Sequence, residues 1–534
     1  MKNVLFSLLF SRLTNKFLLL LFSSVICTFN NSKTAIASNP RSITGERWLT
    51  HVEEDLNPFF EIEDAWGDEI GNFPTRRTNT GLFNPNKNPL NHFVAQSRQT
   101  FAYGVAYHLT GESKFLTLAK AGVDWIGENG IDQTLGGTYK YLSQPSNTPD
   151  NNFNSRTSQE QAYALQGMAF YYYLTRDEDV LNNIVSLKND LFDTYYDDSR
   201  NVMNFLPTDT VDSQLRLTAT LDQLNTYLLL LTPIVPDDYK QSFETDLQNL
   251  SQSLLDNFYS SEYNVFWLRE GNNQLLERQT DYGHSIKSLW MLQQAGEVLN
   301  DNKLINFAEK NATELLAEAF HEPSGSWAND PYFDENGNFT QDLNKDWWIY
   351  QELDQMAGTM CLQETSFCDD YLENTVNWYF DNMVDKTYGG VYQRVSADGL
   401  TARGKKQWKW KSGFHSYEHA LVGYITSQFA VDEEIQVHYA HTDDICSPTG
   451  GLIFGSINPY YYEGDITQCQ TNSILSTGNE ELDLILGESN YQQTSITFSF
   501  NNTESVPEPL TIIGTIVAGI IGTIIKKKIP YDRS

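Results

Sequence analysis

Two histidines, each placed just before an apolar helical run, are the residues of this sequence best suited to acid–base chemistry. His284 lies in the stretch DYGHSIKSLW, and His415 lies far downstream in KSGFHSYEHALVGY. Histidine has an unperturbed pKa near neutrality, so one at a helix start, at the mouth of a barrel or bundle, can act as a general base. Either residue alone would more simply be a capping or core histidine. Their similar loop-to-helix positions favour a paired function.

The elements that must position these histidines are predominantly helical, from about Arg47 to Phe429. Apolar residues recur there at steps of three and four, as in amphipathic helices. The pattern predicts twelve helices, at residues 44–64, 91–110, 113–128, 157–175, 178–197, 214–232, 236–258, 283–298, 301–319, 345–362, 367–384 and 412–429. Six hairpins of such helices predict an all-α (α/α)6 barrel with the longer loops over one mouth. An open helical solenoid is the alternative, and it would lack a closed central pocket.

Short motifs in the loops support a repeated hairpin. The segments GGTY at residues 136–139 and GGVY at residues 389–392 are near copies of one another. The run VFWL at residues 265–268, followed by GNN and Leu275-Leu276, predicts a small β-hairpin. We therefore place the barrel at residues 38–431.

A different composition follows the barrel. Residues 432–500 are rich in Tyr, Thr, Ser, Asn and Gly, with alternation near residues 435–439 and 494–500, which predicts a small β-rich appendage. Four cysteines remain outside the first 37 residues, and they pair most simply as Cys361–Cys368 and Cys446–Cys469. Four free buried thiols are the alternative. Metal-ligand spacing such as C-x-x-C is absent, so we expect no metal site.

Residues 1–37 have the pattern of an export signal. Lys2, Arg12 and Lys16 precede an apolar run at residues 17–26, and Ala-Ile-Ala at residues 35–37 forms a small-x-small cleavage site. An amphipathic membrane anchor is the alternative. The pattern predicts that the remaining chain acts outside the cytoplasm.

The composition narrows the classes of partner. A formal net charge of -33 argues against binding nucleic acid, because the phosphates would repel the protein. The chain also contains 29 Tyr, 30 Phe and 11 Trp residues. Aromatic rings usually fill cores, but they also stack on sugar rings. The composition therefore favours a carbohydrate partner.

Five segments, in this order and spacing, resemble the N-acylglucosamine 2-epimerase superfamily, which includes cellobiose 2-epimerases and mannose-type isomerases. They are AQSRQTFAYGVAYHLTGE with Arg98, IDQTLGGTY, DYGHSIKSLW, KDWWIYQELDQMAG and KSGFHSYEHALVGY. The resemblance covers roughly residues 45–430. It implies 2-epimerisation or aldose–ketose isomerisation of an opened sugar, without a cofactor.

The resemblance also implies a role for each matching residue. His284 and His415 would be the two bases that remove and return the proton at C2 of the sugar. Arg98 would hold the sugar oxygens and stabilise the enediolate through charge-assisted hydrogen bonds. The competing interpretation of Arg98 is a surface ion-pair residue on a helix.

Further matching residues would form the wall of the sugar site. Trp347 and Trp348 would stack on the sugar, and Glu352 would orient Arg98 or a histidine. Adjacent tryptophans cannot share one helix face, so one of them could instead pack in the core. Tyr103, close to Arg98 in sequence, is expected to contribute to the same wall.

The sequence departs from the superfamily at two places. The residue three positions after the first catalytic histidine is commonly acidic, whereas here it is Lys287, and a cation would disfavour the imidazolium form of His284. The sixth helix, which often carries another histidine, has Asp222 and Asn225 instead. We expect Lys287, Asp222 and Asn225 to line the substrate site.

The C-terminus resembles the bacterial PEP-CTERM sorting signal. Pro507-Glu508-Pro509 is followed by an apolar helix-forming run at residues 510–525 and then by three lysines. The resemblance implies membrane retention through residues 510–525 and processing by an exosortase-type enzyme. An uncleaved anchor is the alternative for residues 501–534.

Together these features predict an exported, cofactor-independent sugar 2-epimerase or aldose–ketose isomerase. One alternative is a non-catalytic barrel that binds extracellular polysaccharide, which would suit the export signals. Another is a glycoside hydrolase or lyase on the same barrel. Hydrolysis needs paired carboxylates, and Asp222, Asp281 and Glu352 are the candidates.

Overall fold

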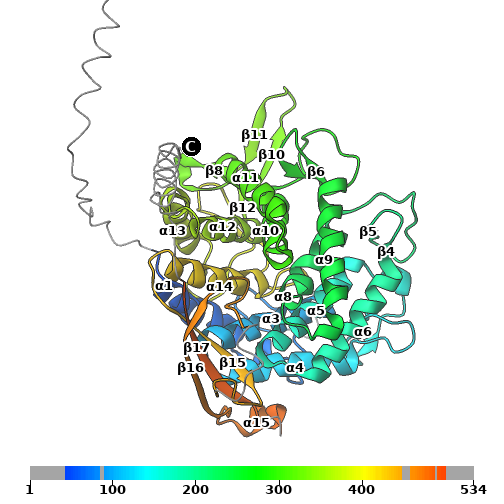
Figure 1. Cartoon of the computed structure of the whole chain (residues 1–534), viewed down its shortest axis with the longest axis vertical. Coiled ribbons are helices and arrows are strands. Elements are labelled where there is room, and N and C mark those ends of the chain that lie inside the picture. Colours follow the sequence, from blue (N-terminus) through cyan, green and yellow to red (C-terminus); the bar gives the residue numbers. More distant parts are fainter. Residues whose placement is uncertain (1–42, 84–88, 448–456, 488–489, 501–534) are drawn as a thin grey trace, which may run out of the picture. The chain divides into compact units, whose positions relative to one another are not determined.

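A computed structural model describes residues 43–83, 89–447, 457–487 and 490–500. Within these residues, helices alternate between an outer and an inner ring (Figure 1). The outer helices are α1 (Gly45–Thr50) with a π-helical turn (His51–Leu56) and α2 (Asn57–Phe60), α4 (Ser113–Asn129), α6 (Glu178–Tyr195), α9 (Asp237–Asn257), α11 (Asn302–Ala319), and a π-helical turn (Cys368–Leu372) with α13 (Glu373–Asn382). The inner helices are α3 (Phe93–Thr110), α5 (Ser158–Thr175), α7 (Leu217–Gln223) with a π-helical turn (Leu224–Leu228) and α8 (Leu229–Leu231), α10 (Tyr282–Leu299), α12 (Trp347–Cys361) and α14 (Phe414–Phe429).

The inner helices form a closed ring. Each inner helix contacts the next one along the chain, and α14 returns to contact α3. Nearly every residue of α3 and α5 is buried, because these helices are covered by the barrel interior on one side and by outer helices on the other. The outer helices α6 and α11 bury only one face. The predicted (α/α)6 barrel is confirmed, and the open solenoid is excluded.

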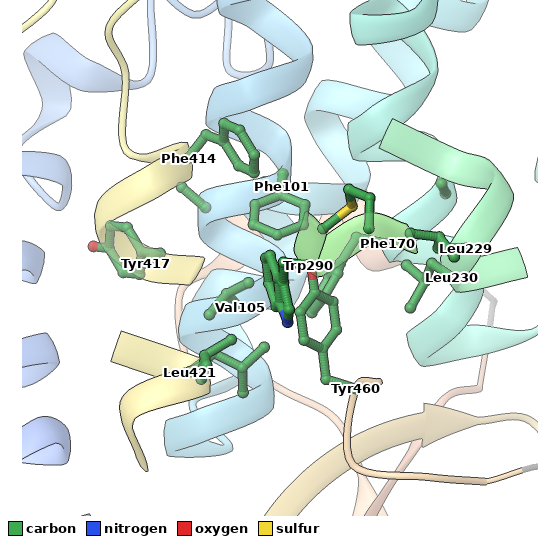
Figure 2. Close-up of a cluster of buried hydrophobic side chains, with 14 of the residues drawn as sticks. Phe101, Val105, Phe170, Leu229, Leu230, Trp290, Phe414, Tyr417, Leu421 and Tyr460 are labelled. Atoms are coloured by element: carbon green, nitrogen blue, oxygen red, sulfur yellow. The ribbon is translucent and has the colours of Figure 1, made fainter. Parts of the chain in front are cut away.

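Aromatic side chains fill the barrel interior between its two ends. Figure 2 shows Phe101, Phe170, Trp290 and Tyr460 pointing toward one another from separate segments. The rings of Phe101 and Phe170 are 4.7 Å apart, and those of Phe101 and Phe414 are 5.1 Å apart, all in edge-on geometry. This packing fills the interior between the two ends of the barrel in the part of the chain that the structure describes.

Short antiparallel strand pairs connect outer helices to the inner helices that follow them. They are β4 (Tyr196–Asp197) with β5 (Val202–Met203), β6 (Tyr259–Ser260) with β7 (Val265–Phe266), and β8 (Phe320–His321) with β9 (Ser326–Trp327). Two glycine pairs make equivalent turns after α4 and α13, with φ of 78° and 67° at Gly136 and Gly137, and 71° and 74° at Gly389 and Gly390. Such positive φ values explain why glycine recurs there.

Longer loops add three further sheets at the end of the barrel where the inner helices begin. The strands are β1 (Leu90–His92), β2 (Tyr141–Ser143) and β3 (Thr148–Pro149); β10 (Asp330–Phe333) and β11 (Phe339–Asp342); and β12 (Lys345–Asp346), β13 (Arg394–Val395) and β14 (Ala402–Arg403). Each sheet is antiparallel. The predicted hairpin between residues 265–268 and Leu275-Leu276 is wrong, since β7 pairs with β6 upstream. Asn264, with φ of 52°, turns the chain directly before β7.

The β-rich appendage lies against the other end of the barrel. It contains β15 (Ile435–His441), β16 (Asp465–Ile474), β17 (Gln492–Ser499) and a short helix, α15 (Glu480–Leu486). The sheet order is β15-β17-β16, all antiparallel. Strand β15 contacts α3, α5 and α14. Hydrogen bonds from the Tyr107 hydroxyl to the Tyr439 carbonyl and between the Tyr173 and Tyr439 hydroxyls join it to α3 and α5.

Both expected disulfides form, and each joins Cα atoms 5.4 Å apart: Cys361–Cys368 and Cys446–Cys469. The export signal and the sorting segment both lie outside the described residues. Among the helices that the structure describes, none combines the length and apolar character needed to cross a membrane.

Candidate active site

A pocket of about 170 Å³ opens at the mouth formed by the N-terminal halves of the six inner helices. Every inner helix contributes at least one lining residue, because each helix begins at this mouth after its connecting loop. The lining residues are Arg98, Gln159, Tyr163, Asp222, His284, Lys287, Trp347, Trp348, Trp410 and His415. The pocket therefore gathers side chains that are up to 317 residues apart in sequence, from Arg98 to His415.

His284 is held by the carboxylate that caps its own helix. Asp281 is the N-cap of α10; its Oδ1 accepts the His284 backbone N–H at 2.6 Å, and its Oδ2 lies 2.7 Å from the ring Nδ1. This contact places the proton on Nδ1 and leaves Nε2 as the basic nitrogen. The sequence suggested that Lys287 would deprive His284 of an acidic partner. Asp281, one turn before rather than one turn after the histidine, supplies that partner.

His415 is the second residue of α14 and is buried. Its Nδ1 lies 3.4 Å from Oε1 of Glu352. Burial lowers the pKa of His415 well below its usual value, and the positive charges of Arg98, Lys287 and Lys411 lower this pKa further. His415 is therefore a neutral imidazole at neutral pH, the form required of a base.

Trp347 and Trp348 both line the pocket, although they are adjacent in sequence. They are the first two residues of α12, where the helix projects into the mouth. The Trp348 ring lies 4.6 Å from the His284 ring and 6.1 Å from the His415 ring, measured between centroids. Trp347 contacts His415 edge-on at 6.2 Å. Trp347 is also buried in the hydrophobic core, so it both packs in the core and lines the pocket, whereas Trp348 contacts both candidate bases.

Arg98 reaches the pocket from α3. Its guanidinium lies 3.9 Å from the centre of the Tyr163 ring and 5.5 Å from the Trp410 ring, and it donates to the Trp410 carbonyl. Arg98 is buried, and its Nε has no hydrogen-bond partner among the described residues. A buried cation that is held between aromatic faces and lines the pocket can bind the oxygens of a polar ligand.

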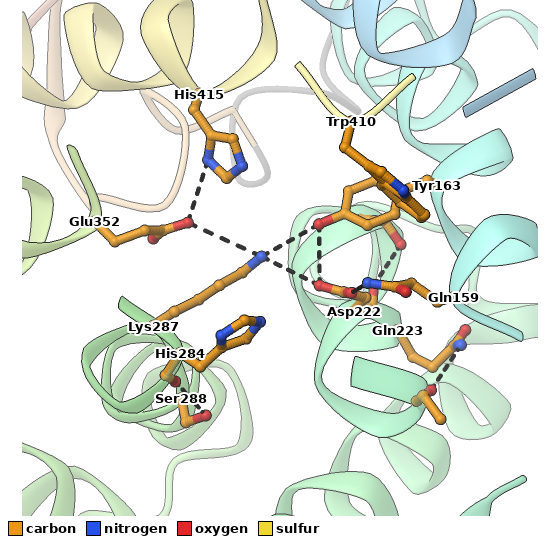
Figure 3. A network of polar contacts seen from close by, with 12 residues as sticks. Gln159, Tyr163, Asp222, Gln223, His284, Lys287, Ser288, Glu352, Trp410 and His415 are labelled. Carbon is orange, nitrogen blue, oxygen red and sulfur yellow. Dashed lines mark hydrogen bonds and ion pairs between the residues drawn. The ribbon is translucent and has the colours of Figure 1, made fainter. Parts of the chain in front are cut away.

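Lys287 is the second cation of the pocket and is almost fully buried. Figure 3 shows its ammonium between Asp222, the Tyr163 hydroxyl and Glu352. Its Nζ lies 3.2 Å from Asp222 Oδ1, 3.4 Å from the Tyr163 hydroxyl and 3.9 Å from Glu352 Oε1. Burial alone lowers the pKa of Lys287, but the charges of Tyr163, Asp222 and Glu352 outweigh it and raise this pKa above its usual value. Lys287 is therefore a permanent ammonium near neutral pH.

Asp222 is fixed by three donors. Its Oδ1 accepts from Lys287 and from the Tyr163 hydroxyl at 3.0 Å, and its Oδ2 accepts from the Gln159 amide at 2.8 Å. Gln159 and Tyr163 are four residues apart and share one face of α5. With its carboxylate oxygens engaged by these donors, Asp222 serves to hold Lys287 and Tyr163.

Two buried carboxyl groups lie behind the lining residues. Burial raises the pKa of Glu352 to about 8, Lys287 opposes this rise and Glu418 adds to it. Burial likewise raises the pKa of Glu418, to about 7, while a hydrogen bond from Tyr460 and the charge of Lys287 oppose the rise. Burial therefore favours the neutral form of both carboxyl groups, which lie next to His415 and Lys287.

Glu352, His415 and Glu418 bring potential metal-ligand atoms within 4.8 Å of one another. However, the Lys287 ammonium lies 3.9 Å from the same Glu352 carboxylate. A divalent cation would be repelled by this ammonium and by Arg98, whose charge already lowers the pKa of His415. The arrangement fits carboxyl groups that bind protons better than it fits a metal ion.

Seven of the ten residues expected at the site from the sequence line the pocket, and Glu352 contacts two of them from behind. Tyr103 does not lie at the pocket. Its hydroxyl donates to the Phe60 carbonyl at 2.8 Å, and its ring packs against Phe73 and Phe115 on the outer side. Five residues of α-helix rotate a side chain by about 500°, so Tyr103 points about 140° away from Arg98.

Asn225 is buried in the π-helical turn after α7 and is not among the lining residues. Sequence reasoning missed Gln159, Tyr163 and Trp410 as lining residues. The segment QWKWKSGFH, in which Trp410 directly precedes the His415 segment, is a signal that could have identified this tryptophan.

Comparison with known sequences supports the resemblance to sugar epimerases. The chain is 22% identical over 358 residues to the cellobiose 2-epimerase of Eubacterium cellulosolvens, covering 60% of this chain and 85% of that protein. It is 24% identical over 350 residues to the cellobiose 2-epimerase of Dictyoglomus turgidum, covering 60% and 84%. No protein-family model matches the chain.

Solved structures of sugar epimerases and isomerases share the fold. The cellobiose 2-epimerase of Bacillus thermoamylovorans superimposes with a TM-score of 0.62 at 17% identity, covering 71% of this chain and 98% of that chain. A D-mannose isomerase superimposes with a TM-score of 0.59 at 14% identity, covering 73% and 100%. About a quarter of this chain therefore has no counterpart in those barrels.

Proposed function

We propose that the protein is a cofactor-independent sugar 2-epimerase or aldose–ketose isomerase. One observation carries the proposal: the rings of His284 and His415, from two different inner helices, line one pocket and both contact Trp348. Each ring also has its own carboxyl partner, Asp281 or Glu352. Two bases in one small pocket suit a reaction that removes a proton and returns it elsewhere.

The proposed reaction begins on the open-chain sugar. One histidine takes the proton from C2, and the electron pair of the C2–H bond moves toward the carbonyl, which forms an enediolate. The other histidine, which must start with a proton on its pocket-facing ring nitrogen, donates that proton to the opposite face of C2 in epimerisation. In isomerisation, a protonated histidine donates to C1 while the hydroxyl proton moves from O2 to O1. Arg98 and Lys287 stabilise the negative enediolate oxygens, because both are cations held in a pocket of low dielectric.

The size of the pocket supports a substrate with one reacting sugar ring. A pocket of about 170 Å³ is smaller than the roughly 300 Å³ at which pockets for drug-sized ligands begin. Trp347, Trp348 and Trp410 provide aromatic surface for the sugar carbons. Asp222 is the one carboxylate among the lining residues. Because glycoside hydrolysis uses two carboxyl groups flanking the bond, this pocket favours proton transfer over hydrolysis.

We also propose that the protein acts outside the cytoplasm. Two disulfides suit an oxidising compartment. The signal-like segment at residues 1–37 and the sorting-like segment at residues 501–534 suit export, retention through residues 510–525 and processing by an exosortase-type enzyme. Both segments lie outside the described residues.

The test is proton exchange at C2, followed by NMR in deuterated water with the purified full chain and a panel of aldoses, ketoses and cellobiose. The wild type is expected to exchange the C2 proton of at least one sugar and to form its epimer or ketose. His284→Ala and His415→Ala are each expected to abolish product formation. His321→Ala is the control, because His321 lies in β8 outside the pocket, with its Nδ1 2.6 Å from the Ser324 hydroxyl.

A wild type that folds but exchanges no sugar proton would refute the proposed reaction. Binding of polysaccharide without turnover, measured on a glycan array with the same preparation, would then favour the non-catalytic barrel. Product formation that persists in both histidine variants would refute the assignment of the bases.

A further inference from the structure

Residues 457–463 of the appendage carry three consecutive tyrosines, and each one is anchored in the barrel. The Tyr460 backbone N–H donates to the Tyr173 hydroxyl at 2.8 Å. The Tyr461 ring lies 3.9 Å from the Tyr460 ring and contacts Trp290 of α10 edge-on at 5.8 Å. The Tyr462 hydroxyl lies 2.8 Å from the Thr359 hydroxyl of α12. The segment is therefore packed into the barrel end opposite the pocket.

Tyr460 connects the appendage to a buried carboxyl group of the barrel. Its hydroxyl donates to Oε1 of Glu418 at 2.7 Å, and both residues are buried. Figure 2 shows Tyr460 rising from its loop into the aromatic interior beside Trp290. Tyr460 has φ of 60°, a left-handed backbone conformation that is uncommon for a tyrosine. Such a conformation persists when surrounding contacts impose it, and it is found most often at functional positions.

Glu418 connects this tyrosine to the active site. It lies on α14 one turn after His415, and one of its oxygens is within 4.8 Å of ligand-type atoms of Glu352 and His415. The charges of Lys287 from α10 and Arg98 from α3 both act on Glu418. Among the appendage residues, Tyr460 donates to Glu418, and the charge of Glu418 acts on Tyr461 and Tyr462.

We propose that Tyr460 of the appendage is a positioning residue that holds Glu418 in the charge network of Lys287, Glu352 and His415. This inference rests on the proposed function, because Lys287 and His415 of the network line the proposed sugar pocket. It makes the appendage a working part of the catalytic unit rather than a separate binding module. The Tyr460 hydrogen bond favours the ionised form of Glu418, so its loss makes that carboxyl group harder to ionise.

The experiment follows the side-chain carboxyl carbons of the full chain, labelled with [5-13C]glutamate, in a pH titration by NMR without sugar. The resonance of Glu418 is identified by its loss in Glu418→Gln. In Tyr460→Phe, the midpoint of the Glu418 titration is expected to rise by about one pH unit. Tyr462→Phe is the matched control, because it removes a buried hydroxyl of the same segment that bonds Thr359 instead.

A Glu418 midpoint in Tyr460→Phe equal to that in Tyr462→Phe would overturn the proposal. Should Tyr460→Phe fail to fold, Glu418→Gln provides a second measurement. Removing the Glu418 charge is expected to lower the titration midpoint of Glu352, since Glu418 raises the pKa of Glu352. An unchanged Glu352 midpoint would overturn the proposal too. Neither titration needs substrate, so absence of C2 exchange in the wild type would refute the function without being confused with either result.

Discussion

At the scale of single residues, the contact between His284 and Asp281 gives the most specific expectation. Asp281→Asn retains a side-chain oxygen to cap α10, but its amide can donate to Nδ1 and so favours the wrong tautomer of His284. By analogy with the loss of a carboxylate behind a catalytic histidine, turnover should fall on the order of 10²-fold or more. Steady-state kinetics of epimer formation would measure this.

The control is Asp301→Asn, which changes the N-cap of α11 in the same way and lies outside the pocket. Equal turnover in both variants would contradict the assigned role of Asp281.

Lys287 gives a second expectation at this scale. Lys287→Met would leave the buried carboxylate of Asp222 without its cation, so we expect loss of turnover and a decrease in stability of about 3–5 kcal/mol. Lys188→Met is the matched control, since Lys188 is equally buried and paired with Asp246, far from the pocket lining. Both variants should unfold at a lower denaturant concentration than the wild type, whereas only Lys287→Met should lose turnover. Turnover that survives Lys287→Met would contradict its role.

At the scale of elements, the barrel depends on close approach of inner and outer helices. A Cβ at Gly423 of α14 would lie 2.3 Å from Cε2 of Trp48 on α1. Gly423→Ala should therefore destabilise the protein by about 1–3 kcal/mol. Gly127 of α4 has open space, with its nearest contact at 3.7 Å, so Gly127→Ala should stabilise the protein by about 0.5–1 kcal/mol. The thermal unfolding temperature should fall in Gly423→Ala and rise in Gly127→Ala. A Gly423→Ala variant as stable as the wild type would contradict the close packing.

The bounds of the twelve helices could be predicted from the sequence to within four residues, because the 3.6-residue periodicity depends on local side chains alone. The direction in which Tyr103 points could not be predicted, since it depends on which side of α3 faces the barrel axis. The partner of His284 was sought one turn downstream, whereas a residue one turn upstream is equally close on a helix. The Tyr460 contact with Glu418 joins the appendage to α14 across 42 residues of sequence, and no local pattern encodes it.

At the scale of the whole molecule, the buried carboxyl groups predict a pH dependence of stability. The pKa of Glu352 is raised from 4.5 to about 8. The folded protein therefore keeps a proton that the unfolded chain loses. The stability contributed by this group is present below about pH 4.5 and is lost as pH rises through about 8. As the pH is raised from 5 to about 9, the free energy of unfolding should therefore fall less in Glu352→Gln than in the wild type.

Denaturant midpoints across that range would check the prediction, with the exposed Glu128→Gln as control. An identical pH dependence in wild type and Glu352→Gln would contradict it.

The central claim is that two bases serve opposite faces of one sugar carbon, and half-reactions test it most directly. The measurement is C2 proton exchange in deuterated water, started separately from each of the two epimers, in His284→Ala and in His415→Ala. If each histidine serves one face, His284→Ala should still exchange one epimer and His415→Ala only the other, with no interconversion in either variant. Loss of exchange from both epimers in one variant, with full exchange retained in the other, would contradict the two-base account.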